Sequence, residues 1–268
     1  MPPGRDAPLT GKMTDRIVML GRLFYAVGMA AIGVQHFVNG DFVAVILPSY
    51  PEGIPGHAFW TYAFGAGLVV SGAAMALGGK ARPAAILLGT ALLAAILFRD
   101  IPVQLAGNFR YLGAWTNVFK ALTLSGGAFV VAATAHRENE PSLDRFFVGF
   151  GCFGLAVTVA VFGIDHFIYT EFVASLVPSW IPGHVFWTYF CGAALIAAGA
   201  GMLLGIKARL AAGLLGSIIF VWLLVLHIPR AIADPTGANG DEWTSVFEAL
   251  AFSGIAFILA RKLPKKKG

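Results

Sequence analysis

Residues 36–62 of this chain read HFVNGDFVAVILPSYPEGIPGHAFWTY, and residues 166–189 read HFIYTEFVASLVPSWIPGHVFWTY. When Pro51, Glu52 and Gly53 are left out of the first stretch, 24 positions align and 15 of them are identical. Each copy joins the end of one apolar segment to the start of the next. A repeated connection between helices therefore decides the fold.

The composition indicates a membrane protein. The chain is 57% hydrophobic and 12% charged, with a mean hydropathy of +0.76, whereas soluble domains have about 25% charged residues. A membrane-spanning helix needs about 20 apolar residues, and the pattern lacks the alternation of barrel strands. Eight apolar segments are predicted, at residues 17–38, 58–78, 83–98, 116–135, 146–165, 185–205, 210–228 and 244–260.

The lysines and arginines favour one orientation in the membrane. If the N-terminus is cytoplasmic and the segments alternate, fifteen basic residues face inward and only Arg99, Arg110 and Arg230 face outward. The positive-inside rule then predicts that both termini are cytoplasmic and that both copies of the repeated connection face outward. The net charge of +5 follows from this bias, so it gives no support for nucleic-acid binding.

Further matches extend the repeat over most of the chain. Residues 115–129 and 243–257 share 10 of 15 positions, and a Lys-Ala-Arg step precedes the third segment of each half. We predict an all-α polytopic protein built as two parallel four-helix-bundle repeats around a pseudo-two-fold axis along the membrane normal. The predicted parts are a tail (1–16), the first repeat (17–135), a linker (136–145), the second repeat (146–260) and a basic tail (261–268).

These features resemble the DoxX and DoxX-like membrane family. The matching features in each half are a His-Phe at the end of the first helix, a Phe-Val-Ala connection, a Phe-Trp-x-Tyr at the start of the second helix, and a basic loop. The resemblance implies a helical bundle in the inner membrane of a bacterium or archaeon. It also implies a link to quinone-dependent oxidoreductases, because some members of that family are subunits of such enzymes.

Histidines and aromatic residues mark candidate ligand positions near the outer face. Imidazoles relay protons, ligate metals or haem, or hydrogen-bond a quinone carbonyl, and they also cap helices and turns. Tryptophans form membrane-interface belts or flank a flat ring ligand. The histidine spacing predicts no metal site, and we expect no haem. The ligand-binding candidates are His36, His57, His166, His184, His227, Asp100, Trp60 and Trp187.

Two charges fall inside predicted helices. Lys120 and Glu248 occupy equivalent positions in the fourth and eighth segments. An isolated charge at that depth costs a few kcal/mol, so we expect the two to meet across the axis. Such a pair serves either as a structural salt bridge or in proton or substrate handling. Cys152 and Cys191 are predicted to differ in depth by about 10 Å, which favours packing roles over a disulfide.

The leading functional hypothesis is an integral membrane component of a quinone-linked redox system. A quinone or other apolar ring would bind near the outer face, and a redox subunit or a second copy of the chain would be the partner. One alternative is a small-solute transporter or channel that uses the repeat interface. Another is a structural or accessory subunit of a membrane complex. No nucleotide-binding or hydrolase motif is present, and whether the protein is an enzyme stays open.

Overall fold

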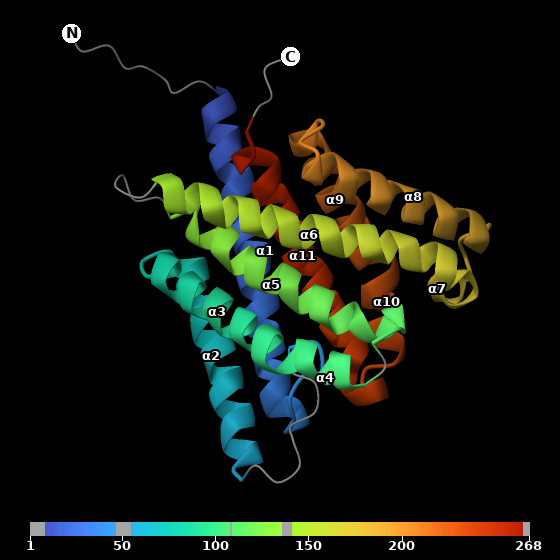
Figure 1. Cartoon of the computed structure of the whole chain (residues 1–268), viewed down its shortest axis with the longest axis horizontal. Coiled ribbons are helices and arrows are strands. Elements are labelled where there is room, and N and C mark those ends of the chain that lie inside the picture. Colours follow the sequence, from blue (N-terminus) through green and yellow to red (C-terminus); the bar gives the residue numbers. More distant parts are fainter. Residues whose placement is uncertain (1–8, 47–54, 108, 136–140, 265–268) are drawn as a thin grey trace.

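A computed structural model describes residues 9–46, 55–107, 109–135 and 141–264 (Figure 1). Parts of the predicted tails (1–8 and 265–268), residues 47–54 of the first repeated connection, and residues 136–140 of the linker lie outside the described residues. Among the described residues, every regular element is helical.

The helices follow the predicted segments closely. A π-helical turn joins α3 to α4 (Ile96–Asp100) and another joins α9 to α10 (Leu223–His227), while 3-10 turns cover Leu112–Trp115 and Gly237–Gly240. The α-helices are α1 (Leu9–Asn39), α2 (His57–Leu77), α3 (Ala81–Ala95), α4 (Ile101–Ala106), α5 (Thr116–Ala132), α6 (Pro141–Ile168), α7 (Thr170–Leu176), α8 (His184–Leu203), α9 (Ala208–Trp222), α10 (Ile228–Ala233) and α11 (Asp241–Lys262).

Seven helical stretches of the described chain are long and apolar enough to cross a membrane. The remaining predicted segment, residues 116–135, forms α5, which has 17 residues and buries most of them. Two helices start earlier than expected: α1 begins at Leu9, inside the predicted tail, and α6 begins at Pro141, inside the predicted linker. Proline suits the first turn of a helix because no partner is needed there for its missing N–H group.

The third segment of each half is longer than the sequence indicates. The predicted end at residue 98 lies within the first π-helical turn, and the predicted end at residue 228 directly follows the second. Both helices continue past Pro102 and Pro229 to Ala106 and Ala233. A proline inside an α-helix removes one hydrogen bond and clashes with the carbonyl four residues earlier. The wider π turn accommodates this defect, so the helix continues.

The two halves of the chain interlock. Helix α1 packs against α2 and, from the other half, α11, whereas α6 packs against α8 and, from the other half, α5. Helices α5 and α11 lie at the centre, with α2 and α3 on one flank and α8 and α9 on the other (Figure 1). The start of α1 and the end of α11 lie at the same end of the molecule (Figure 1). The repeat symmetry and the membrane orientation stay predictions.

Glycines permit the close crossings between the halves. A Cβ atom on Gly21 of α1 would lie 2.6 Å from the carbonyl oxygen of Gly254 in α11, and one on Gly151 of α6 would lie 2.6 Å from that of Gly126 in α5. A methyl group does not fit at such distances. Small residues let helix backbones approach in lipid, where close packing stabilises association.

The Lys-Ala-Arg steps tie helix ends together, at the ends of α5 and α11. Arg82 Nη1 donates to Ala132 O at 3.0 Å and to Asp144 Oδ1 at 2.6 Å. Arg209 donates to two main-chain carbonyls at the end of α11, at 2.8 and 2.6 Å. Cations at helix C-termini satisfy the last carbonyls and complement the helix dipole. These arginines therefore also stabilise the fold, a role that the sequence analysis did not assign.

Candidate functional site

A cavity of about 710 Å³ lies between the helices of the second half and the start of α5. Helices α6, α7, α8, α9 and α11 contribute most of its wall. The wall is largely apolar and aromatic, as is typical of small-molecule sites. Its aromatic side chains include Tyr111, Phe162, Tyr169, Trp187 and Trp222.

The Lys120–Glu248 ion pair lies in this wall. Lys120 Nζ is 2.9 Å from Glu248 Oε2, and the side chains are 23% and 5% exposed. The two charges thus meet across the halves, as expected from the sequence. Glu248 Oε1 is buried and has no hydrogen-bond partner within the described part of the chain. Each charge stabilises the other, but one carboxylate oxygen is left unsatisfied.

Two histidines line the same cavity. His166 Nδ1 lies 2.6 Å from Phe162 O, and since a carbonyl only accepts, this geometry assigns the proton to Nδ1. In the neutral ring, Nε2 is then a hydrogen-bond acceptor. His227 ends the π-helical turn before α10, with Lys120, Arg230 and Glu242 as its charged neighbours. The cavity therefore has a polar side formed by imidazoles and the ion pair.

Asp165 also lines the cavity and adds a second unsatisfied oxygen. Its Oδ1 atom is buried without a hydrogen-bond partner among the described residues. Thr188 and Cys191 line the wall contributed by α8, and Trp222 of α9 lines the same cavity. Both cysteines of the chain are free and buried, in agreement with packing roles.

The connection after α1 is packed quite differently. His36 is fully buried, with Nδ1 2.8 Å from Ile32 O. The ring of Phe42 lies between two imidazoles, 5.9 Å from the His36 ring and 5.9 Å from that of His57. Val43 and its neighbours Val45 and Ile46 belong to the hydrophobic core. Side chains of the first connection therefore occupy the space beside His36.

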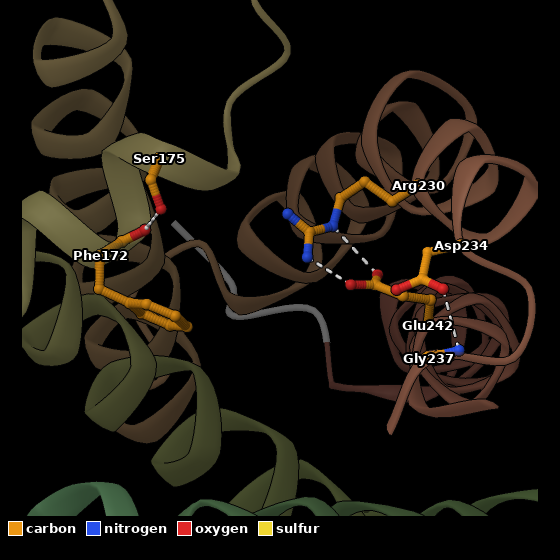
Figure 2. Close-up of polar contacts among 6 residues, drawn as sticks. All are labelled: Phe172, Ser175, Arg230, Asp234, Gly237 and Glu242. Carbon is orange, nitrogen blue, oxygen red and sulfur yellow. Dashed lines mark hydrogen bonds and ion pairs between the residues drawn. The ribbon is translucent and has the colours of Figure 1, made fainter. Parts of the chain in front are cut away.

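The second connection leaves its histidine, His166, in the lining of the cavity. Phe172, the counterpart of Phe42 in the sequence alignment, lies in α7, is 66% exposed and lines the cavity. Ser175 Oγ donates to Phe172 O at 2.6 Å, and Figure 2 shows the Phe172 ring pointing away from α7, toward the side occupied by Arg230 and Glu242. The Phe172 ring therefore lines the cavity, whereas the Phe42 ring packs beside His36.

An ion pair lies just beyond His227 in the sequence and joins α10 to α11. The guanidinium of Arg230 forms a two-pronged contact with Glu242, with Nε to Oε2 at 3.0 Å (Figure 2). Asp234 Oδ1 accepts a hydrogen bond from the Gly237 N–H at 3.0 Å. These contacts join α10 to the start of α11 and fix the position of the turn that bears His227. Paired charges twelve residues apart were not recognised in the sequence.

The cavity brings together half of the predicted site residues: His166, His227, Trp187, Lys120 and Glu248.

The other candidates lie apart from the cavity lining. His36 and Asp100 are buried elsewhere, and His57 Nε2 lies 2.9 Å from Asp41 Oδ1 at the surface. Trp60 is exposed and His184 begins α8. Among the described residues, no group of three His, Cys, Asp or Glu side chains could hold a metal ion.

The fold defines a multi-pass helical membrane protein, and its second half encloses a largely apolar cavity. Residues 17–100 match the DoxX family model, which confirms the resemblance over that part of the chain. Residues 155–252 match a model described as a domain of unknown function, DUF8561, and include most of the cavity lining. No curated protein and no solved structure matches the chain. The tandem duplication stays a prediction.

Proposed function

We propose that the protein is an integral membrane component of a quinone-linked redox system and that the cavity binds the quinone ring. The observation that supports this most is a largely apolar cavity with a polar side. Its volume of about 710 Å³ lies within the range of about 300–1,000 Å³ found for small-molecule sites. Trp187 and Trp222 offer flat faces for the ring, and the apolar wall suits an isoprenoid chain.

The polar side chains suit ring oxygens that gain and lose protons. Lys120 and His227 can donate hydrogen bonds to a ring oxygen, while His166 Nε2 and the Glu248 carboxylate can accept a proton from it. A bound quinone supplies a couple of two electrons and two protons. The chain positions the ring, excludes water and provides proton acceptors, and a redox partner subunit exchanges electrons with it.

Tryptophan fluorescence tests this function. We expect a short-chain benzoquinone to quench the protein in lipid nanodiscs saturably, with a stoichiometry near one. Trp187→Phe should remove part of the quenching because Trp187 lines the cavity, whereas the matched variant Trp60→Phe, on the exposed start of α2, should retain the saturable signal. Quenching that rises linearly with quinone and is equal in all variants would contradict the proposal.

A small-solute transporter is the second candidate. The observation that favours it is the Lys120–Glu248 pair, which joins the halves and faces the cavity. Intramembrane charges commonly mark solute and ion pathways. Uptake of a zwitterionic solute into proteoliposomes tests this candidate. Uptake by the unmodified protein that Glu248→Gln abolishes, without quinone binding by either protein, would favour the transporter over the redox component.

A further inference from the structure

We propose that an anionic phospholipid binds with its phosphate beside Arg22, where α1 faces the turn between α2 and α3. The site is separate from the cavity, since neither Arg22 nor Lys80 belongs to the cavity lining. It therefore goes beyond the proposed function and does not depend on it.

Arg22 is a cation without an acceptor in the described chain. Its side chain is partly buried on α1, and none of its hydrogen bonds or ion pairs is to a described residue. The Nε atom is enclosed and unpaired, whereas the two Nη groups are not enclosed. A guanidinium carries five N–H donors and stays charged, and an unpartnered charge within a membrane-spanning helix is costly. A ligand that accepts hydrogen bonds from the Nη groups removes that cost.

Two other arginines show how this fold satisfies a guanidinium at a helix end. Arg82 and Arg209 donate to main-chain carbonyls at the ends of α5 and α11. Arg22 also reaches a helix end, because a Cβ atom on Gly78, the C-cap of α2, would lie 3.7 Å from Nη2. It donates to no described carbonyl there. Its counterpart in the second half is the uncharged, buried Cys152, so helix packing at this level does not require a cation.

The turn beside Arg22 adds a second cation. Lys80 follows Gly78 by two residues and is exposed. A Cβ atom on Gly79 would meet nothing within 4 Å, so the turn has open space next to it. Neither Arg22 nor Lys80 is paired with a carboxylate in the part of the chain that the structure describes. Two unpaired cations favour an anionic headgroup over one that carries its own ammonium group.

Exposed apolar side chains beside the cations indicate a lipid rather than a free anion. Leu77 directly precedes the turn and is 87% exposed, and Met19, one helical turn before Arg22, is 51% exposed. Both belong to helices that are long and apolar enough to cross a membrane. A phospholipid can place its phosphate at the cations and its acyl chains along this surface. Basic pockets between membrane-spanning helices bind anionic headgroups in this way.

Thermal unfolding of the full chain in a neutral detergent tests the site. Three additives are titrated: dioctanoyl phosphatidylglycerol, dioctanoyl phosphatidylcholine and inorganic phosphate. We expect the phosphatidylglycerol to raise the Tm saturably, and native mass spectrometry to give a stoichiometry near one. The phosphatidylcholine, with the same acyl chains, should bind at least tenfold more weakly. Inorganic phosphate should give no saturable shift, because it makes no apolar contact.

Three variants test the residues. Arg22→Gln should weaken phosphatidylglycerol binding at least tenfold, because an amide lacks the charge and the fork of donors that matches a phosphate. Lys80→Gln should weaken it severalfold. Lys207→Gln is the matched control, since Lys207 is exposed before α9 as Lys80 is before α3, and it should leave the affinity unchanged. If Arg22→Gln fails to fold, the comparison of Lys80→Gln with Lys207→Gln decides.

Four results would overturn the proposal. An equal shift with inorganic phosphate would show a site for a free anion, and equal binding of the phosphatidylcholine would show that the headgroup charge is not recognised. Equal losses in Lys80→Gln and Lys207→Gln would show general attraction to a basic surface. No binding of the phosphatidylglycerol would exclude the site. None of these results bears on quinone binding, because the cavity is a different site.

Discussion

Lys120 and Glu248 show how much a buried charge depends on its partner. Their contact at 2.9 Å joins α5 to α11, and the carboxylate is almost completely enclosed. Removal of one member of a buried pair leaves an uncompensated charge, whereas replacement of both members by apolar residues is often neutral. The pair is therefore expected to behave as a unit.

We expect Lys120→Met to lower the free energy of unfolding by about 3 kcal/mol, at the low end of the range for buried pairs because Lys120 is partly exposed. The double variant Lys120→Met, Glu248→Met should recover most of that loss. Lys207→Met, at an exposed lysine, serves as the control. Denaturant titrations in detergent micelles measure the unmodified protein, the single variants Lys120→Met and Glu248→Met, the double variant and the control, and strictly additive effects would contradict a direct coupling.

The sequence predicts this pair but not the cavity beside it. Equal spacing and opposite charge at matched positions suffice to expect contact between Lys120 and Glu248. The choice of Asp165 and His166 over His36 depends on whether Phe42 or Phe172 packs inward. That difference depends on tertiary packing of two similar connections, which no local pattern encodes.

For the helices, the sequence predicts that close crossings occur, but it does not predict where the helices end. Glycine- and alanine-rich segments predict close approach in lipid. The partners were not predictable, because nothing in the spacing indicates that α1 meets α11 rather than α5. Pro102 and Pro229 look like helix ends after polar residues, yet a π-helical turn absorbs each proline and carries the helix on.

Two neighbouring glycines of α6 test the crossing. A Cβ atom on Gly151 would clash with α5, whereas one on Gly149 meets nothing within 4 Å. We expect Gly151→Ala to destabilise the protein by about 1–3 kcal/mol through overpacking. Gly149→Ala should be neutral or stabilising by up to about 1 kcal/mol, since alanine favours the helix. Thermal unfolding in nanodiscs compares the two, and equal melting temperatures would show that the crossing is loose.

For the whole molecule, the sequence predicts the class of protein and the structure supplies the connection between its halves. Composition and helix lengths suffice for a multi-pass helical membrane protein. Charge bias predicts the orientation, with α10 and the start of α11 outside and the start of α9 inside. The interlocked packing of α1 on α11 and of α6 on α5 was not foreseen, since each predicted repeat was treated as its own bundle.

Cysteine labelling tests the orientation. In intact cells, a membrane-impermeant maleimide should react with Thr236→Cys and should reach Lys207→Cys only after the membrane is opened. Both positions are exposed. The native cysteines Cys152 and Cys191 are buried, so the unmodified protein provides the unlabelled control. The reverse pattern would show that the termini face outward.

The buried Arg82 and the partly buried Arg209 have a consequence for the surrounding lipid. A lysine or arginine on a flexible surface position can extend toward the headgroups and adjust to bilayers of different thickness. These two guanidinium groups cannot, because each is bound to the carbonyls that end a central helix. They fix how deeply the bundle is immersed. In a thicker or thinner bilayer the lipid must deform around the protein, so hydrophobic mismatch is expected to change the membrane before it changes the cavity.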